Sequence, residues 1–331
     1  MTISLSELAH IKVSVHDADK AYQVLRTIFG AQKIKEDFVN SFIKVVHVGL
    51  GDFVLQYIEP IAEKGPWYDQ LQTKGPGIFS LAFCVENIKK TVETLEKKGG
   101  IIPLYSMDGE EQDYVKLIPS EFLNPTIKTA YMMNSMEKLG FHLELAEKPM
   151  NEELTSPKTQ YVTGSDHLIG DASTMLHVEL VTHDADKTHE FLHEIFGSER
   201  VEKEFNSLLD NEYMHAVHVN LSNVVLQYLQ PITKPETWDG RTWGKILRKN
   251  GSYVHNLNWL VDDIEETIVK FKKEKFKTIF KQQLTPDADT HYYMMRSLNK
   301  LGFHLEHGET PTEPLPEGFF FTDYKKEKYE D

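Results

Sequence analysis

The feature that most constrains the fold of this chain is an internal duplication. Residues 10–30, "HIKVSVHDADKAYQVLRTIFG", align with residues 177–197, "HVELVTHDADKTHEFLHEIFG", and 10 of the 21 positions are identical. The segment "LGFHLE" stands at residues 139–144 and again at residues 301–306. The repeated unit is about 140 residues long, far beyond the roughly 20–50 residues of a solenoid repeat. The sequence therefore predicts one domain that is used twice.

The extent of the repeat sets the expected domain boundaries. We expect a first domain over residues 1–146 and a second domain over residues 173–308. Residues 147–172 are polar, with scattered Pro, Gly, Ser and Thr, which is typical of a linker. Residues 309–331 are rich in charge and contain several prolines, and they are expected to form a tail.

Composition excludes several classes of protein. The net charge of −15 disfavours nucleic acid and anionic membranes as partners, because both require clustered positive charge. The first ten residues lack the pattern of a secretory signal, and no apolar run is long enough to span a membrane. Cys84 is the single cysteine, so an internal disulfide and a thiolate metal cluster are both excluded. These features favour a cytoplasmic location.

Each unit contains the same succession of predicted elements. A short alternating strand leads into an amphipathic helix, for which Asp17 is a suitable N-cap and Gly30 a suitable C-terminal residue. Three further strands follow, and the order of strand, helix and three strands then recurs within the unit. The predicted fold class is α+β, with four βαβββ modules paired into two tandem units.

Alternation along the strands places polar side chains on one face of each predicted sheet. In "HIKVSV", His10 and Lys12 share the face opposite the aliphatic residues, and in "FHLEL" His142 and Glu144 do the same. Pairing across the turn that follows His47 puts that histidine on the face of a glutamine in the next strand. An ionisable face of this kind is either a solvated surface or the lining of a site.

The order of motifs resembles the vicinal oxygen chelate superfamily, which includes glyoxalases, bleomycin-resistance proteins and ring-cleaving dioxygenases. The residues that carry the resemblance are "H-x5-H-D" with "IFG", "LGDFVLQYIEP", "GPGIFSLAFCVENI" and "LGFHLE". The resemblance covers nearly the whole chain apart from the linker and the tail. It implies that paired modules form mixed sheets, curled into a cup that holds a divalent metal ion.

The resemblance also implies a ligand set in each half. The first strand, the middle strand and the last strand would supply His10, Gln56 and Glu144 in the first half, and His177, Gln227 and Glu306 in the second. At a further position many members of the family place a second histidine, and this chain has Ser80 and Asn256 there. The strict set of two histidines and one carboxylate that supports iron-based oxygen chemistry is therefore missing from the family positions.

Four more histidines are candidate catalytic groups, as bases or as additional metal ligands. They are His47, His142, His218 and His304. By strand parity His255 falls on the face opposite Asn256, so we expect it to be structural. Trp67 aligns with Trp238 and is expected to form an aromatic side of the pocket.

The donor set of His, Gln and Glu most resembles the glyoxalase and methylmalonyl-coenzyme A epimerase branch of the family. This implies an isomerase, epimerase or lyase that acts on a small substrate with vicinal oxygens through a metal-stabilised enolate. The divalent ion (Fe, Zn, Mn, Co or Ni) is not identified by the sequence. A homodimer is an open option.

Two alternative functions stay open at this point. An Fe(II)-dependent ring-cleaving or 2-oxo-acid dioxygenase is one, because single chains of four modules are common in that branch. The other is a metal-free protein that binds a small molecule, as in the resistance branch. Metal content and oxygen dependence would separate the three.

Overall fold

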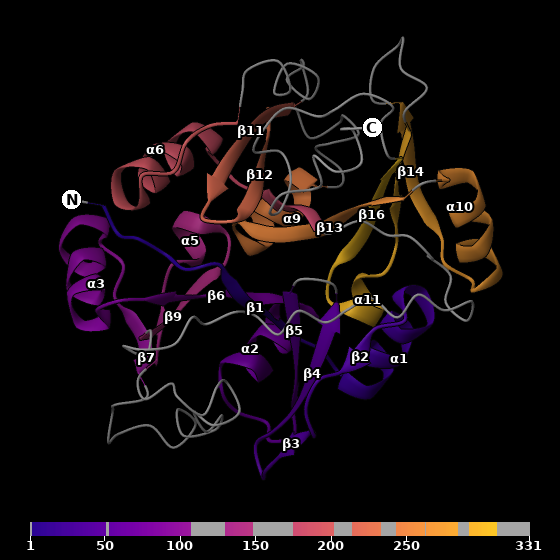
Figure 1. Cartoon of the computed structure of the whole chain (residues 1–331), viewed down its shortest axis with the longest axis horizontal. Helices are drawn as coiled ribbons and strands as arrows, with labels where there is room; N and C mark the ends of the chain where they lie inside the picture. The colour runs from indigo at the N-terminus through magenta and orange to yellow at the C-terminus, as the bar shows by residue number, and fades with distance from the viewer. Residues whose placement is uncertain are drawn as a thin grey trace, which may run out of the picture.

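The computed structural model covers most of the two predicted domains (Figure 1). It describes residues 2–50, 53–106, 130–147, 175–201, 214–232, 243–261, 263–283 and 291–309. Apart from Glu147 and Glu309, the expected linker and tail lie outside these residues, as does Trp238.

The elements of both halves follow the predicted order of strand, helix and strands, twice per half. The first half contains β1 (Leu8–Ser14), α1 (Ala18–Phe29), β2 (Gln32–Lys33), β3 (Phe38–Val39), β4 (Ile43–Leu50), β5 (Phe53–Pro60), α2 (Pro66–Thr73), β6 (Gly77–Val85), α3 (Ile88–Thr94), the π-helical η1 (Leu95–Gly99), β7 (Pro103–Ser106), β8 (Ala130–Met133), α5 (Met136–Leu139) and β9 (His142–Glu147). The second half contains β10 (Met175–Val181), α6 (Ala185–Phe196), β11 (Met214–Leu221), β12 (Val224–Pro231), α9 (Trp243–Asn250), β13 (Tyr253–Val261), α10 (Ile264–Lys273), β14 (Thr278–Gln283), β15 (His291–Met295), α11 (Leu298–Leu301) and β16 (His304–Glu309).

Each half forms one mixed sheet, which confirms the predicted α+β class. Within the described residues the first sheet has the order β2-β4-β5-β1-β6-β9-β8-β7, with β3 paired to β4. The second sheet has the order β11-β12-β10-β13-β16-β15-β14. In both sheets the two modules meet through an antiparallel pair, β1 with β6 and β10 with β13. Modules therefore pair within a half and not across the halves.

Local sequence explains where the first helix of each half begins and ends. The side chain of Asp17 accepts a hydrogen bond from the Lys20 backbone N–H, and Asp184 caps α6 in the same way. Gly30 ends α1 with φ 67°, a left-handed conformation that favours glycine. The predicted caps are thus confirmed. No described helix has both the length and the apolar composition needed to cross a membrane.

The apolar faces of the two sheets and their helices share one hydrophobic core. Ile11 of β1 and Leu257 of β13 are both fully buried in this core. The Phe29 ring of α1 packs 5.0 Å from the Trp259 ring of β13, so a helix of the first half contacts the sheet of the second. The π-helical η1, which continues α3, contacts α6, and in Figure 1 α1 lies next to α11.

The glycine of the repeated "LGFHLE" segment lies at the contact between the halves. Gly302 follows α11 with φ 81°, and a Cβ atom there would collide with Val13 of β1. Gly140 has φ 83°, and a Cβ atom there would lie 3.1 Å from Leu180 Cδ2 of β10. Each glycine therefore permits both a left-handed turn and a close approach to the other half. The repeated glycine serves the packing of the halves, while the histidine and glutamate of the same segment face the opposite side of the sheet.

Candidate metal centre

Strand register brings polar side chains of the second half into two adjacent rows. Across β10, β13 and β16, His177 pairs with Asn258, and Asn258 pairs with Glu306. The next row contains Gln227, Glu179, Asn256 and His304.

The equivalent rows of the first half have a different composition. The first row consists of His10, Ala82 and Glu144, and the second of Gln56, Lys12, Ser80 and His142. The two halves have the same register, so each position in one row has a defined counterpart in the other half.

These rows are not a solvated surface. Every polar side chain in the two rows of both halves is at most 9% exposed, apart from His10, which is partly buried. The alternative of a solvated polar face is therefore wrong for this chain. Buried polar and charged groups have to satisfy one another or bind a ligand.

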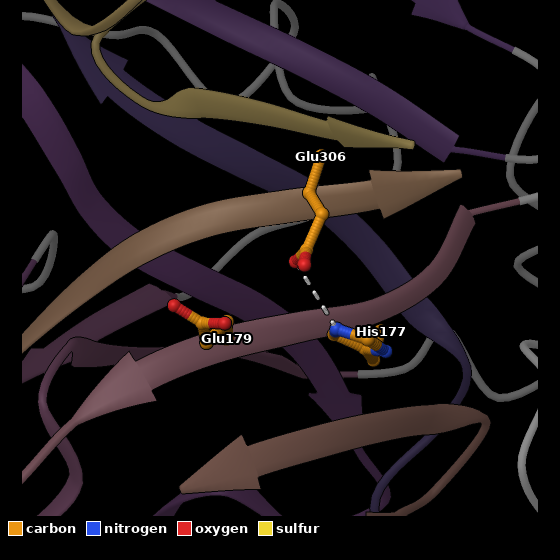
Figure 2. Close-up of side chains that lie close together, drawn as sticks. All are labelled: His177, Glu179 and Glu306. Carbon is orange, nitrogen blue, oxygen red and sulfur yellow. Dashed lines mark ion pairs between the residues drawn. The ribbon is translucent and has the colours of Figure 1, made fainter. Parts of the chain in front are cut away.

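Three ionisable side chains of the second half converge on one point. Ligand atoms of His177, Glu179 and Glu306 all lie within 4.8 Å of one another, and all three residues are buried. Figure 2 shows His177 and Glu179 projecting from one strand and Glu306 reaching toward them from another, with His177 Nε2 3.8 Å from Glu306 Oε2. No other group of three His, Cys, Asp or Glu side chains among the described residues brings its ligand atoms this close together. The trio is consistent with a divalent metal site.

The charge of this trio is unbalanced without a cation. Burial, and then the facing charge of Glu306, raises the pKa of Glu179 well above its usual value. Two carboxylates in one buried site repel each other, so one of them takes up a proton unless a cation is present. Glu306 Oε2 accepts no hydrogen bond from any described residue. A free carboxylate oxygen beside an imidazole is a suitable donor for a metal ion.

A hydrogen-bonded chain fixes Glu179 in place. The Trp243 indole Nε1–H donates to His255 Nε2 at 3.0 Å, so the His255 proton resides on Nδ1 and is donated to Glu179 Oε1 at 2.8 Å. Burial lowers the pKa of His255 to about 4, which keeps the ring neutral. A neutral histidine that orients a carboxylate from behind is typical of the outer shell of a metal site.

The expected place of His255 was wrong, and the reason is local. The register of β10 and β13 shifts between Glu179 and Leu180, and this irregularity turns His255 toward Glu179. Simple alternation from Asn256 cannot anticipate such a shift. A similar correction applies to Trp67, whose structural counterpart is Trp243. Trp67 precedes Ser80 of β6 by the same number of residues as Trp243 precedes the equivalent Asn256 of β13.

In the first half a lysine ammonium fills the equivalent space. Lys12 Nζ lies 2.7 Å from Glu144 Oε2, and His10 Nε2 lies 3.4 Å from the same oxygen. Ser80 Oγ donates to it at 3.0 Å. Burial alone would raise the pKa of Glu144. The charge of Lys12 and the neighbouring His10 instead hold this pKa well below its usual range. Glu144 is therefore balanced by groups of the protein itself.

The remaining candidate residues lie near the two sites without joining the carboxylates. Gln56 Nε2 is 2.8 Å from His47 Nε2, and Gln227 Nε2 is 2.7 Å from His218 Nε2, so each glutamine is paired with a histidine of the neighbouring strand. Burial lowers the pKa of His47 and of His218 to about 3. The His218 ring lies 6.3 Å from the His177 ring, at the edge of the trio.

The histidines of the last strands contact backbone carbonyl groups. His142 Nδ1 lies 3.2 Å from the Met133 carbonyl oxygen, and His304 Nδ1 lies 3.3 Å from the Met295 carbonyl oxygen. Burial lowers the pKa of His142 to about 4 and that of His304 to about 3. Each imidazole is therefore held by a backbone contact, and its role in catalysis stays a prediction.

Comparison with known proteins finds a family match in the first part of the chain and similar folds over its whole length. A model of the Glyoxalase/Bleomycin resistance protein/Dioxygenase superfamily matches residues 9–115. Over 95% of both chains the structure is similar to a variant of 4-hydroxymandelate synthase from Streptomyces coelicolor, with 14% identity and a TM-score of 0.57. A halotolerant catechol dioxygenase is similar over 94% of this chain and 89% of its own, with 10% identity and a TM-score of 0.56.

A third solved structure shares the same two-unit architecture. It is a fusion of a xylose isomerase-like TIM barrel with 4-hydroxyphenylpyruvate dioxygenase, and it matches 96% of this chain and 51% of its own, with 12% identity and a TM-score of 0.56. The family match covers residues 9–115 of this chain, and the likeness to these structures over the whole chain is a likeness of fold. No curated protein sequence matches it.

The structural likeness over nearly the whole chain confirms the predicted fold. At 10–14% identity the structural likeness establishes the fold and leaves the site residues to be argued from this chain. Sequence reasoning missed Glu179 and Asn258, and it noted Lys12 only as a residue on the polar face. The signal was available in strand parity, since Glu179 and Asn258 each stand two residues from a position that the resemblance had singled out.

Proposed function

We propose that this protein is a metal-dependent dioxygenase that binds one Fe(II) ion per chain in its second half. The ligands would be His177, Glu179 and Glu306, and the substrate a small molecule with vicinal oxygens. The observation that carries this proposal is the buried, unbalanced pair of carboxylates beside an imidazole. A dication would neutralise both carboxylates and complete the site.

The chemistry of the donors supports a first-row divalent metal. Imidazole and carboxylate suit iron, manganese and related ions, whereas the absence of a second cysteine disfavours thiolate-seeking ions. Such an ion, when bound, supplies Lewis acidity to a chelating substrate and, as Fe(II), reducing power toward dioxygen. The burial of all three ligands keeps bulk water from the open positions.

The residues around the trio have roles that follow from their contacts. Trp243 and His255 orient the Glu179 carboxyl group through a chain of two hydrogen bonds. Asn258 lies between His177 and Glu306 in the strand register, and its Oδ1 accepts no hydrogen bond from a described residue. We propose that the Asn258 amide binds a substrate oxygen.

The whole-chain architecture favours oxygen chemistry over the isomerase function expected from the sequence. The catechol dioxygenase and the fusion protein named above each share the arrangement of two tandem units over at least 94% of this chain. We further propose that the first half binds no metal, because Lys12 already supplies a positive charge to Glu144.

A second candidate function is supported by the donor set itself. One imidazole and two carboxylates differ from the two histidines and one carboxylate that usually support Fe(II) oxygenases. A redox-inactive ion such as Zn²⁺ or Mn²⁺ in this site would support proton removal beside a carbonyl. An isomerase or epimerase is therefore the alternative to be excluded.

Metal content and oxygen dependence together test the proposal. Protein purified under anaerobic conditions should contain about one iron per chain by elemental analysis, and Glu306→Ala should remove it. With a panel of catechols and 2-oxo acids, the protein should consume oxygen in proportion to product. Glu144→Ala is the matched control, and it should leave the metal content unchanged if it folds.

Other outcomes point elsewhere. Zinc, manganese, cobalt or nickel, together with turnover that survives strict anaerobiosis, would replace the dioxygenase by the isomerase. Absence of any bound metal, with ligand affinity unchanged by Glu306→Ala, would leave a metal-free binding protein.

A further inference from the structure

A pocket lies where the two halves meet, beside the candidate metal centre. It is lined by the end of α2 and the turn into β6 from the first half, and by α9 and the start of β13 from the second. We call it the seam pocket and define it by Gln70, Lys74, Asn250, Tyr253, His255 and His304. Both halves contribute side chains to it.

The polar groups of the seam pocket are suited to an anion. Its lining includes one lysine and no aspartate or glutamate, although the chain as a whole carries a net charge of −15. Lys74 is an exposed residue at the rim, and among the described residues no acidic group forms an ion pair with it. The half-buried amides of Gln70 and Asn250 add neutral hydrogen-bond donors. An organic anion would therefore find a cation and amide donors at the rim.

The walls of the seam pocket are apolar. Ile78 and Val254, which occupy equivalent positions in β6 and β13, line it together with Leu298. Gly77 has no side chain, and a Cβ atom there would lie 2.8 Å from Gln70 Nε2. The missing side chain therefore leaves room for the Gln70 amide over the strand. Aliphatic walls below a polar rim fit a flat apolar body with one charged end.

The inner end of the seam pocket reaches the outer shell of the metal centre. His255 lines the pocket and donates a hydrogen bond to Glu179 at 2.8 Å, while its ring lies 5.0 Å from the His304 ring. The Tyr253 ring packs 5.9 Å from the His255 ring, and the Tyr253 hydroxyl has no hydrogen-bond partner among the described residues. A molecule in the pocket is therefore separated from Glu179 by one side chain.

We propose that the seam pocket binds a small aromatic or aliphatic carboxylate, with Lys74 of the first half binding the carboxylate group and the apolar body directed toward His255. As a statement about the substrate class, this inference rests on the proposed function. As a statement about binding, it does not. The first half would thus contribute to a site whose metal ligands all belong to the second half.

Two probes of the same shape and different charge test the proposal on the full-length protein. Binding of 4-fluorobenzoate and of 4-fluorobenzamide is followed by fluorine NMR, with the protein as purified and again after treatment with a chelator. The carboxylate should bind about tenfold more tightly than the amide in both states, since a charge-assisted contact to Lys74 is available only to the carboxylate. Lys74→Met should remove this preference without changing amide binding.

Matched variants and the chelator arm complete the experiment. Lys97→Met removes the same charge from an exposed helix away from the pocket, and it should preserve the preference. Asn250→Asp should weaken carboxylate binding by a similar factor, because it adds a negative charge to the lining. Equal binding of the two probes, or a preference unaffected by Lys74→Met, would overturn the proposal. So would carboxylate binding that disappears with the metal, which would place the probe on the ion instead.

Discussion

The two halves of this protein have the same strand register but balance their buried charge in opposite ways. In the first half Lys12 lies 2.7 Å from Glu144, so a buried carboxylate is paired with a cation of the chain itself. In the second half the counterpart of Lys12 is Glu179, which adds a second carboxyl group beside Glu306. One exchange of side chain thus separates a self-neutralised site from a buried pair of carboxyl groups that a proton or an external cation has to balance.

Neighbouring positions reinforce the difference. Phe79 and Ala82 of the first half have His255 and Asn258 as counterparts in the second. The Phe79 ring packs 4.7 Å from the His142 ring, inside a small apolar cluster. At these positions the first half therefore has apolar side chains. The second half has side chains that can donate or accept hydrogen bonds or bind a metal ion.

The largest expected effect comes from removing one carboxylate in each half. Glu306→Gln should reduce bound metal from about one ion per chain to nearly none, with the fold retained, because repulsion between two buried carboxyl groups is relieved. Glu144→Gln should retain the metal but lower the free energy of unfolding by roughly 3–5 kcal/mol, because Lys12 loses its buried partner. Elemental analysis and urea unfolding measure the two outcomes. Loss of metal in both variants would contradict the proposed division between the halves.

Reciprocal exchange of the two distinguishing residues should transfer the metal site. Lys12→Glu gives the first half the same ionisable set as the second, so that metal content should approach two ions per chain. Glu179→Lys should supply the missing charge internally and bring metal content toward zero. Titration with Mn²⁺, followed by electron paramagnetic resonance, counts the sites. If Lys12→Glu binds no additional ion in a folded protein, the Lys12 position does not decide metal binding.

A smaller effect concerns a buried histidine on the apolar face. The His307 ring packs against Phe29, Trp259 and Phe271, and neither ring nitrogen has a hydrogen-bond partner among the described residues. Burial lowers the pKa of His307 from an ordinary value of 6.5 to about 3. Between these pH values the unfolded chain binds a proton that the folded protein excludes, so stability falls as the pH falls, by up to roughly 1.4 kcal/mol per pH unit.

His307→Leu should therefore flatten the loss of stability between about pH 6.5 and pH 3, where the two pKa values differ. It should also raise the free energy of unfolding at neutral pH by roughly 1–3 kcal/mol, because an unsatisfied buried polar ring is removed. The first half has Leu145 at the equivalent position, and Leu145→His is the reverse control. Urea unfolding at a series of pH values measures both. An unchanged pH dependence in His307→Leu would show that other groups cause the acid sensitivity.

The smallest expected effect distinguishes two equivalent tyrosines. The Tyr228 hydroxyl donates to the Leu139 carbonyl oxygen of the other half at 3.2 Å, whereas the Tyr57 hydroxyl has no partner among the described residues. Tyr228→Phe should cost about 1 kcal/mol of unfolding free energy, the usual net value of one such bond, and Tyr57→Phe should be neutral or slightly stabilising. Thermal unfolding of the two variants side by side provides the test. Equal effects would show that the bond between the halves contributes nothing.

Much of the fold could be predicted from the sequence because its signals are local or periodic. Asp17 and Gly30 mark the ends of a helix within a few residues of each other in the chain, and the structure confirms both. Alternation along the strands predicted His10 and Glu144 on one face of the sheet, and in the structure His10 Nε2 lies 3.4 Å from Glu144 Oε2. The duplication then carried each of these predictions to the second half.

The candidate site was harder to predict, because its residues are selected by contacts between strands. A register irregularity brought His255 to Glu179, and no period in the sequence encodes an irregularity of that kind. The contact of His304 Nδ1 with the Met295 carbonyl oxygen is likewise set by the pairing of two strands, and the catalytic role of His304 stays a prediction. Lys12 and Glu179 stood on the correct face, but their importance depends on whether the face is buried, which alternation alone does not decide.

The sequence by itself determined the repeated modules, the class of fold and the face on which the ionisable groups lie, because those properties depend on periodicity and on neighbours in the chain. Only the tertiary structure decided that this face is buried, that Lys12 neutralises Glu144 in one half and that Glu179 adds a second buried carboxyl group in the other. The physical reason is that the free energy of a charge depends on everything packed around it, and those neighbours come from distant parts of the chain.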